Sequence, residues 1–129
     1  MTQQASVEGR IEQAYAAMAE ADIDGLLDLY TRDAVIQGAS QPPVVGIDSI
    51  RNFWTATFTQ FEVRLVPEVQ EISDFGEVLV LRGRAVGELV PRDGGVPVQI
   101  DTWFMQVYKR GTDGQVHFWR GANGPNAPK

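Results

Sequence analysis

The chain has 129 residues, a hydrophobic content of 43% and a net charge of −6, with no cysteine and one histidine. This length and composition predict a single globular domain over residues 1–129, and the acidic charge disfavours nucleic acid, whose binding needs clustered Lys and Arg. Without cysteine there are no disulfides or thiolate ligands, and one histidine leaves no histidine cluster, so no metal site is expected.

Apolar residues at helical spacing predict three helices in the first half of the chain. The first covers residues 6–20, the second follows a capping Asp22 and extends to Tyr30, and the third covers residues 47–58. Between the second and third helices we expect a brief strand at residues 33–36 and then a loop punctuated by Gly and Pro.

From Phe61 the apolar period changes to two, which is typical of strands. One strand is expected from residue 61, with a bulge or edge position at Val66-Pro67, and a second from 77 to 90, with turns at residues 74–76 and 91–95. One face of the second strand carries small residues, which leave room for a ligand or for helix side chains. This face comprises Leu79, Leu81, Gly83, Ala85, Gly87 and Leu89.

Residues 96–124 are typical of a long β-hairpin around a glycine-containing turn at residues 110–114. Alternation along its first strand gives two faces: Asp101, Trp103, Met105 and Val107 on one, and Ile100, Thr102, Phe104 and Tyr108 on the other. Both are too apolar to meet water, so one should line a pocket and the other meet a second layer or subunit. We expect Asp101 to face the pocket and Phe104 to lie on the outer face.

Three helices followed by long curved antiparallel strands predict an α+β fold with the helices on one face of the sheet. No internal repeat or linker divides the chain, and residues 1–5 and 125–129 are expected to be loose. No apolar run approaches the roughly 20 residues of a membrane span. The N-terminal residues also lack the apolar stretch of a signal peptide, so we expect a soluble cytoplasmic protein without membrane contact.

The order of these elements resembles the nuclear transport factor 2-like superfamily, and four stretches carry the resemblance. They are AYAAMAEADIDGLLDLYTRDAVI, PPVVGIDSIRNFW, VYKRGTDGQV and WRGANG. Within the superfamily the chain is similar to the SnoaL-like and ketosteroid-isomerase-like branch. The resemblance implies a cone in which three N-terminal helices and a curved antiparallel sheet enclose a pocket. It also implies a homodimer formed through the outer sheet face.

The resemblance allows a residue-by-residue test for the steroid isomerase reaction. Such isomerases use a tyrosine of the first helix, a protonated aspartate and a second aspartate that transfers the proton. Here the tyrosine position falls on Ala14, with Tyr15 one place away, the proton-transfer position falls on Gly38, and Asp101 falls on the protonated aspartate. Loss of one oxyanion donor alone typically costs about 10²–10³ in rate, so we do not expect a true steroid isomerase.

Asp101 and Tyr30 are the candidate catalytic residues. The alternative for Asp101 is a structural carboxylate bonded to backbone, Arg or Tyr, and the alternative for Tyr30 is core packing. The candidate ligand-binding residues suit a flat apolar ligand, and they are Tyr15, Trp54, Trp103, Trp119 and Asn123. For the three tryptophans, core packing without a ligand is an equal alternative.

Two functions from different classes remain open. In the first, the protein is a cofactor-free enzyme that isomerises, cyclises or hydrates a small, largely apolar organic molecule, assisted by Asp101 and Tyr30. In the second, it is a non-catalytic dimer that serves as a ligand-binding or assembly module. A carboxylate within an apolar strand favours the first. The absence of a second pocket carboxylate favours the second, because acid–base catalysis is marked by paired groups of different pKa.

Overall fold

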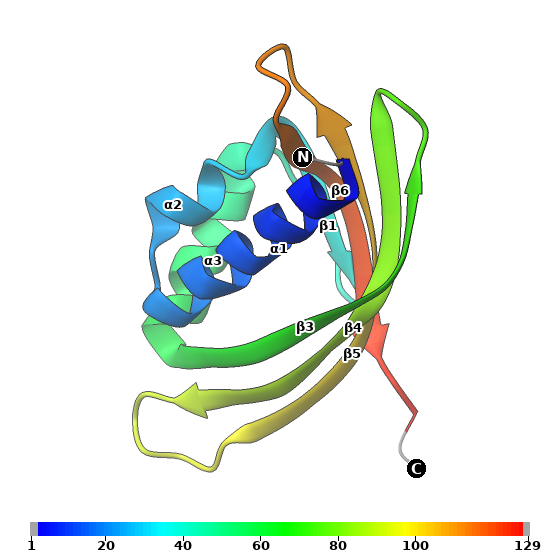
Figure 1. Ribbon diagram of the computed structural model, residues 1–129. Coiled ribbons are helices and arrows are strands. Elements are labelled where there is room, and N and C mark those ends of the chain that lie inside the picture. The colour runs from blue at the N-terminus through cyan, green and yellow to red at the C-terminus, as the bar shows by residue number, and fades with distance from the viewer. Residues whose placement is uncertain (1–2, 128–129) are drawn as a thin grey trace.

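The computed structural model describes residues 3–127, which form three helices on one side of a six-stranded sheet (Figure 1). The helices are α1 (Gln3–Glu20), α2 (Ile23–Leu27) and α3 (Ile47–Gln60). The strands are β1 (Tyr30–Gly38), β2 (Val44–Val45), β3 (Phe61–Asp74), β4 (Val78–Pro91), β5 (Val98–Arg110) and β6 (Val116–Pro125). The predicted α+β class is confirmed.

The sheet has the strand order β2-β1-β6-β5-β4-β3 and is mixed. Its four hairpin-type pairs are antiparallel, whereas β1 runs parallel to β6. This parallel pair joins segments from the two ends of the chain, with Val35 opposite Arg120 and Gly38 opposite Asn123. The alternation of apolar and polar residues within a strand does not indicate which distant strand will pair with it. The prediction of an antiparallel sheet therefore did not include the parallel β1–β6 pair.

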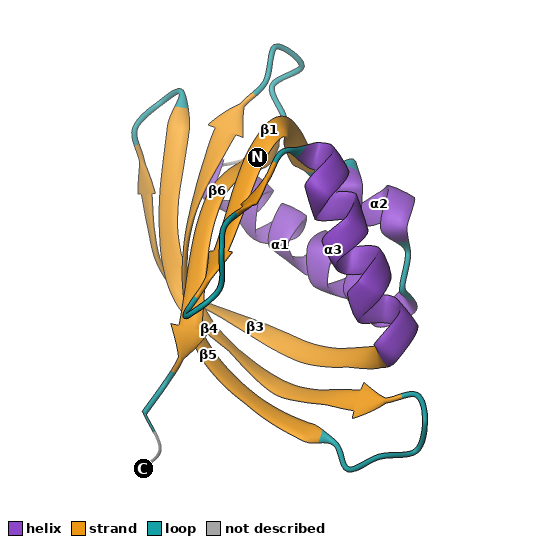
Figure 2. Cartoon of the chain, turned by 180° about the vertical axis from the view of Figure 1, so that it is seen from behind, coloured by secondary structure: helices purple, strands orange, loops and turns teal. Residues whose placement is uncertain are grey.

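The long strands curve around the helices, and Figure 2 shows α1 and α3 on the concave side of the sheet. Register shifts interrupt β3 between Val69 and Glu71 and the β5–β6 pair between Val107 and Tyr108. Such bulges increase the local bend and twist of a strand. At Gly87 of β4 the chain requires glycine, because a φ of 147° and the closeness of the Arg64 carbonyl leave no room for a Cβ.

The core lies between the helices and the concave face of the sheet. Its largest fully buried side chains come from both layers: Val7, Ile11, Leu26, Ile50, Leu79, Leu81 and Val116. The inward orientation of Leu79, Leu81 and Ala85 agrees with the face predicted for β4. Phe104 is also part of this core and is only 3% exposed. The prediction that Phe104 lies on the outer face is therefore wrong.

The second helix is shorter than predicted, and Tyr30 is the first residue of β1 rather than the end of that helix. Asp22 caps α2 as expected, because its side chain accepts a hydrogen bond from the Gly25 N–H at 3.0 Å. Two residues after the helix, the Leu29 carbonyl accepts from the Phe118 N–H at 2.8 Å. This bond to β6 draws the chain into the sheet, which ends the helical stretch before Tyr30.

Within the described residues, secondary structure extends further toward both ends of the chain than predicted. Helix α1 already includes Gln3, and β6 extends to Pro125. Asn126 donates to Asp101 twice, from its backbone N–H at 2.9 Å and from Nδ2 at 2.8 Å. Residues 1, 2, 128 and 129 were also expected to be loose, but they lie outside the described residues. Across residues 3–127, none of the helices has the length and apolar character needed to cross a membrane.

Candidate functional site

A cavity of about 330 Å³ lies between the helices and the concave face of the sheet. This volume falls within the range of about 300–1,000 Å³ that is usual for small-molecule sites. The lining comes from α1, α3 and every strand except β2. It comprises Tyr15, Met18, Tyr30, Ile36, Phe53, Trp54, Thr57, Phe61, Val63, Leu65, Ala85, Leu89, Ile100, Thr102, Phe104, Gln106, Phe118, Gly121, Ala122 and Asn123.

The cavity wall is mainly apolar and aromatic. Among the described residues that line it there is no carboxylate, amine, guanidinium or imidazole. The ionisable groups among these described lining residues are therefore the phenols of Tyr15 and Tyr30. Because an unpaired charge is costly to bury, such a wall favours an uncharged occupant.

Burial of the two phenols disfavours the charged phenolate. Burial raises the pKa of Tyr15 from 10.0 to about 12. It raises the pKa of Tyr30 as well, and the indole N–H of Trp54 offsets that rise only in part. At neutral pH both hydroxyls can therefore donate a hydrogen bond, and neither is suited to accept a proton.

Trp54 forms an aromatic wall on the α3 side of the cavity. Its ring stacks on Phe58 at a centroid distance of 5.5 Å and meets Phe53 edge-on at 5.1 Å. The indole Nε1 is buried and has no hydrogen-bond partner within the described part of the chain. It lies close enough to Tyr30 to lower the pKa of that phenol, but without the geometry of a hydrogen bond.

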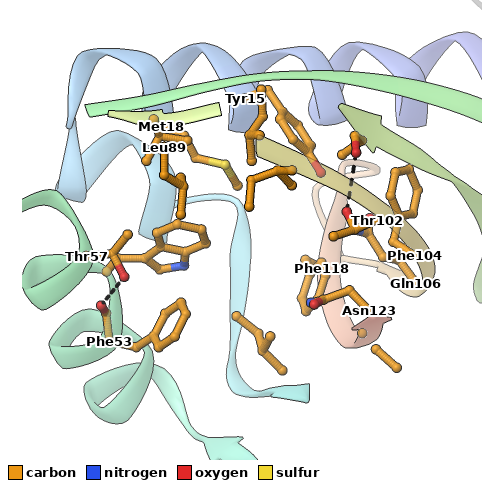
Figure 3. A pocket seen from close by; sticks show the side chains of 18 of the residues that line it. Tyr15, Met18, Phe53, Thr57, Leu89, Thr102, Phe104, Gln106, Phe118 and Asn123 are labelled. Carbon is orange, nitrogen blue, oxygen red and sulfur yellow. Dashed lines mark hydrogen bonds between the residues drawn. The ribbon is translucent and has the colours of Figure 1, made fainter. Parts of the chain in front are cut away.

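Polar side chains gather where β5 and β6 meet the cavity, and Figure 3 shows Thr102, Gln106 and Asn123 close to one another. The Thr102 hydroxyl donates to the Ala85 carbonyl at 3.4 Å. The Tyr108 hydroxyl donates to Gln106 Oε1 at 3.1 Å. The side-chain amide of Asn123 has no hydrogen-bond partner among residues 3–127.

Asp101 does not reach this cavity. Its side chain is 45% exposed on the opposite face of β5, where Arg84 donates to both carboxylate oxygens at 2.9 and 2.8 Å. The prediction that Asp101 faces the pocket is therefore wrong, and the structural alternative describes its surroundings. The physical reason is the two-residue period of a strand: the helices pack against the face that carries Thr102 and Phe104, so Asp101 points away.

Trp103 and Trp119 also lie outside the cavity, which corrects their predicted placement. Trp103 shares the outer face with Asp101, is 42% exposed, and lies over Gly124, where a Cβ would overlap its indole. Two cations lie over the Trp119 ring, with Lys109 Nζ at 4.6 Å and the Arg120 guanidinium at 4.2 Å from its centroid. A register shift at this part of β6 turns Trp119 away from the cavity.

Four of the predicted site residues line the cavity, namely Tyr15, Tyr30, Trp54 and Asn123. Their roles in binding or catalysis remain predictions. The sequence reasoning missed Thr57 and Gln106 as lining residues. Gln106 could have been found from the sequence, because alternation along the strand places it on the same face as Thr102 and Phe104.

Comparison with known proteins gives one family match. Residues 11–119 match the family described as the SnoaL-like domain. Among curated proteins no match is found.

Solved structures with the same fold are numerous, although their sequences have diverged. A ketosteroid isomerase-like protein from Erwinia carotovora atroseptica SCRI1043 is 19% identical, with 99% of this chain and 100% of that chain covered and a TM-score of 0.87. A protein from Novosphingobium aromaticivorans DSM 12444, provisionally named a scytalone dehydratase, is 14% identical, with 97% and 85% covered and a TM-score of 0.83.

A third structure, from Streptomyces avermitilis, is provisionally named a dehydratase of the NTF2-like family. It is 16% identical, with 95% of each chain covered and a TM-score of 0.79. At these identities the three similarities establish the shared fold and nothing further.

Proposed function

The chain belongs to the SnoaL-like domain family, and we propose that it binds a small, uncharged and largely apolar organic molecule in the cavity beneath its helices. The observation that carries this proposal is the composition of the cavity wall, which has no charged side chain among the described residues. Burying the apolar surface of a ligand against such a wall is favourable in free energy, whereas burying a charged group there is costly.

The shape of the wall suits a flat or ring-containing ligand. Phe53 and Trp54 supply ring surfaces from α3, and Phe118 supplies one from β6. Aromatic rings stack on one another or meet edge-on, and each such contact adds about 0.5–1.5 kcal/mol beyond the buried area. The hydroxyls of Tyr15 and Tyr30 supply donors that can orient an acceptor oxygen of the ligand.

A second candidate is a cofactor-free enzyme of the isomerase or dehydratase type. Two observations favour it: the pair of phenol donors at the cavity, and the similarity of fold to structures named as isomerase-like and dehydratase. Against it stands the composition of the described cavity wall, which has no carboxylate or imidazole to act as general base; a group that accepts a proton efficiently has a pKa near the working pH. The pKa of both phenols is raised well above neutrality. Ligand binding is therefore the stronger proposal.

The experiment is a thermal-shift screen with matched neutral and charged ring compounds, supported by native mass spectrometry of the purified protein. A ligand at about 100 times its Kd should stabilise the fold by about 2.7 kcal/mol. Ala85→Leu, which places a larger side chain in the wall, should abolish the shift. Ala56→Leu, at an exposed position of α3, is the matched control and should retain it.

Two outcomes would contradict the proposal: a screen in which only charged compounds stabilise the protein, or an Ala85→Leu variant that binds neutral ligands as well as the original chain. Turnover separates the two candidates. If the bound compound is converted to a product and Tyr30→Phe slows that conversion, the enzyme candidate replaces simple binding.

A further inference from the structure

Two carboxamide side chains, Gln106 of β5 and Asn123 of β6, lie on the cavity side of adjacent strands, and their arrangement extends the proposed ligand-binding function, on which this inference rests. Asn123 pairs with Phe104, and Gln106 pairs with Gly121. The two amides are thus diagonal neighbours on one face of the sheet, a spacing of roughly 7–8 Å between backbones that long side chains bridge. A ligand group that lies between these two side chains would contact both amides.

The orientation of the Gln106 amide is set by Tyr108. The Tyr108 hydroxyl is buried with a side chain only 3% exposed, and it donates to Gln106 Oε1 at 3.1 Å. A carboxamide has its oxygen and nitrogen on the same carbon, so an engaged oxygen fixes the direction of the nitrogen. The Nε2 group is left as a hydrogen-bond donor at the cavity wall.

Asn123 supplies the complementary half of the pair. Its amide can both donate and accept, and it has no hydrogen-bond partner among the described residues. An amide without a protein partner at a cavity wall is available to form hydrogen bonds with a ligand.

We infer that Gln106 and Asn123 together recognise a hydroxyl group on the ligand. The hydroxyl oxygen accepts from Gln106 Nε2, and the hydroxyl proton is donated to Asn123 Oδ1. A carboxylate would fit poorly, because it cannot donate to Asn123 Oδ1 and no cation lies in the described cavity wall to balance its charge. The ligand is then a ring compound with a hydroxyl directed at this amide pair and an apolar body facing Trp54.

The test uses four probes that share one ring system: naphthalene, 2-naphthol, 2-methoxynaphthalene and 2-naphthoate, titrated into the full chain by calorimetry. We expect 2-naphthol to bind about tenfold more tightly than naphthalene, the effect of one or two neutral hydrogen bonds. The methoxy compound accepts but cannot donate, so it should bind more weakly than 2-naphthol. The anionic 2-naphthoate should bind weakest.

Asn123→Leu has nearly the same size and removes the amide, so it should reduce the affinity for 2-naphthol toward that for 2-methoxynaphthalene, which keeps only the bond from Gln106, without weakening naphthalene itself. Gln37→Leu, at an exposed position of β1, is the matched control and should keep the preference. Gln106→Met provides a second variant with the same expected loss, monitored by its melting temperature because the Tyr108 hydroxyl loses its acceptor.

Three results would overturn this inference while leaving the proposed function intact. They are equal binding of naphthalene and 2-naphthol by the original chain, an unchanged 2-naphthol preference in Asn123→Leu, and tightest binding by 2-naphthoate together with measurable binding of naphthalene. Failure of all four probes to bind would instead count against the proposed function and this inference together.

Discussion

Arg84 donates two hydrogen bonds to the Asp101 carboxylate on the outer face of the sheet, from Nε to Oδ1 at 2.9 Å and from Nη2 to Oδ2 at 2.8 Å. Asn126 adds a third bond to the same carboxylate at 2.8 Å. These contacts connect β4, β5 and the segment after β6. The carboxylate that most suggested catalysis in the sequence therefore joins strands on the side of the sheet away from the cavity.

We expect Asp101→Asn to leave ligand affinity unchanged and to lower the melting temperature only slightly. The ion pair is exposed, and solvent-exposed pairs contribute little to stability. Ligand titration and thermal denaturation of the variant check this. Arg84→Met, which removes the other partner, should behave in the same way. A marked loss of ligand affinity in Asp101→Asn would show that the carboxylate does act on the cavity.

Phe104→Ala should destabilise the fold strongly, because its side chain is packed in the core at 3% exposure. Truncation of a buried phenylalanine costs about 3–5 kcal/mol. Met105→Ala, the next residue on the opposite face at 50% exposure, is the control and should cost far less. Urea denaturation of the two variants measures the difference. Similar losses from both would contradict the assignment of faces on β5.

Stability should fall as the pH rises above about 10, the ordinary pKa of a phenol. The pKa of Tyr15 is raised in the folded state to about 12, so folding favours the protonated phenol. This contribution is complete below pH 10 and disappears as the pH rises to about 12. Tyr30 acts in the same direction. One pKa unit corresponds to 1.36 kcal/mol, so the raised pKa of Tyr15 contributes at most about 3 kcal/mol to the free energy of unfolding.

Tyr15→Phe isolates the part of this effect that belongs to Tyr15. Urea midpoints measured across the alkaline range should fall less steeply in the variant than in the original chain, because phenylalanine has no proton to lose. Identical slopes would mean that the Tyr15 phenol titrates in the folded protein as it does in the unfolded chain.

Trp54 should report ligand binding through its fluorescence, because it is the tryptophan that lines the cavity, whereas Trp103 and Trp119 lie outside it. We expect a ring ligand to quench or shift the emission of the original chain, and Trp54→Phe to lose this response. Trp103→Phe is the control and should keep it. A response that disappears in Trp103→Phe would instead place the ligand on the outer face.

We propose that the outer sheet face is a homodimer interface, as the family resemblance implies. Its exposed apolar residues are not the predicted ones, because Phe104 lies in the core. Trp103, Met105 and Val66 are 42%, 50% and 65% exposed there. Exposed apolar residues gathered on one face are typical of an interaction surface. Trp103→Glu should reduce the mass measured by light scattering from dimer to monomer. Phe75→Glu, at an exposed turn between β3 and β4, should leave the mass unchanged.

The helices and strands were largely predictable because their signals are local. Apolar spacing located α1 and α3 to within a few residues, and Asp22 marked the start of α2 through its capping side chain. Tyr30 was assigned to the wrong element for a non-local reason. Its chain segment joins the sheet by bonding to β6, about ninety residues later in the sequence, as the Leu29–Phe118 hydrogen bond shows.

The sequence by itself determined the composition of each face of β5, since alternation separates Asp101 and Trp103 from Thr102 and Phe104 whatever the rest of the chain does. Only the tertiary structure decided which face became the cavity wall. Both faces are apolar enough to be buried, so that choice depends on where the helices pack. Packing of the helices against Phe104 brought Gln106 and Asn123 to the cavity and left Asp101 outside, paired with Arg84.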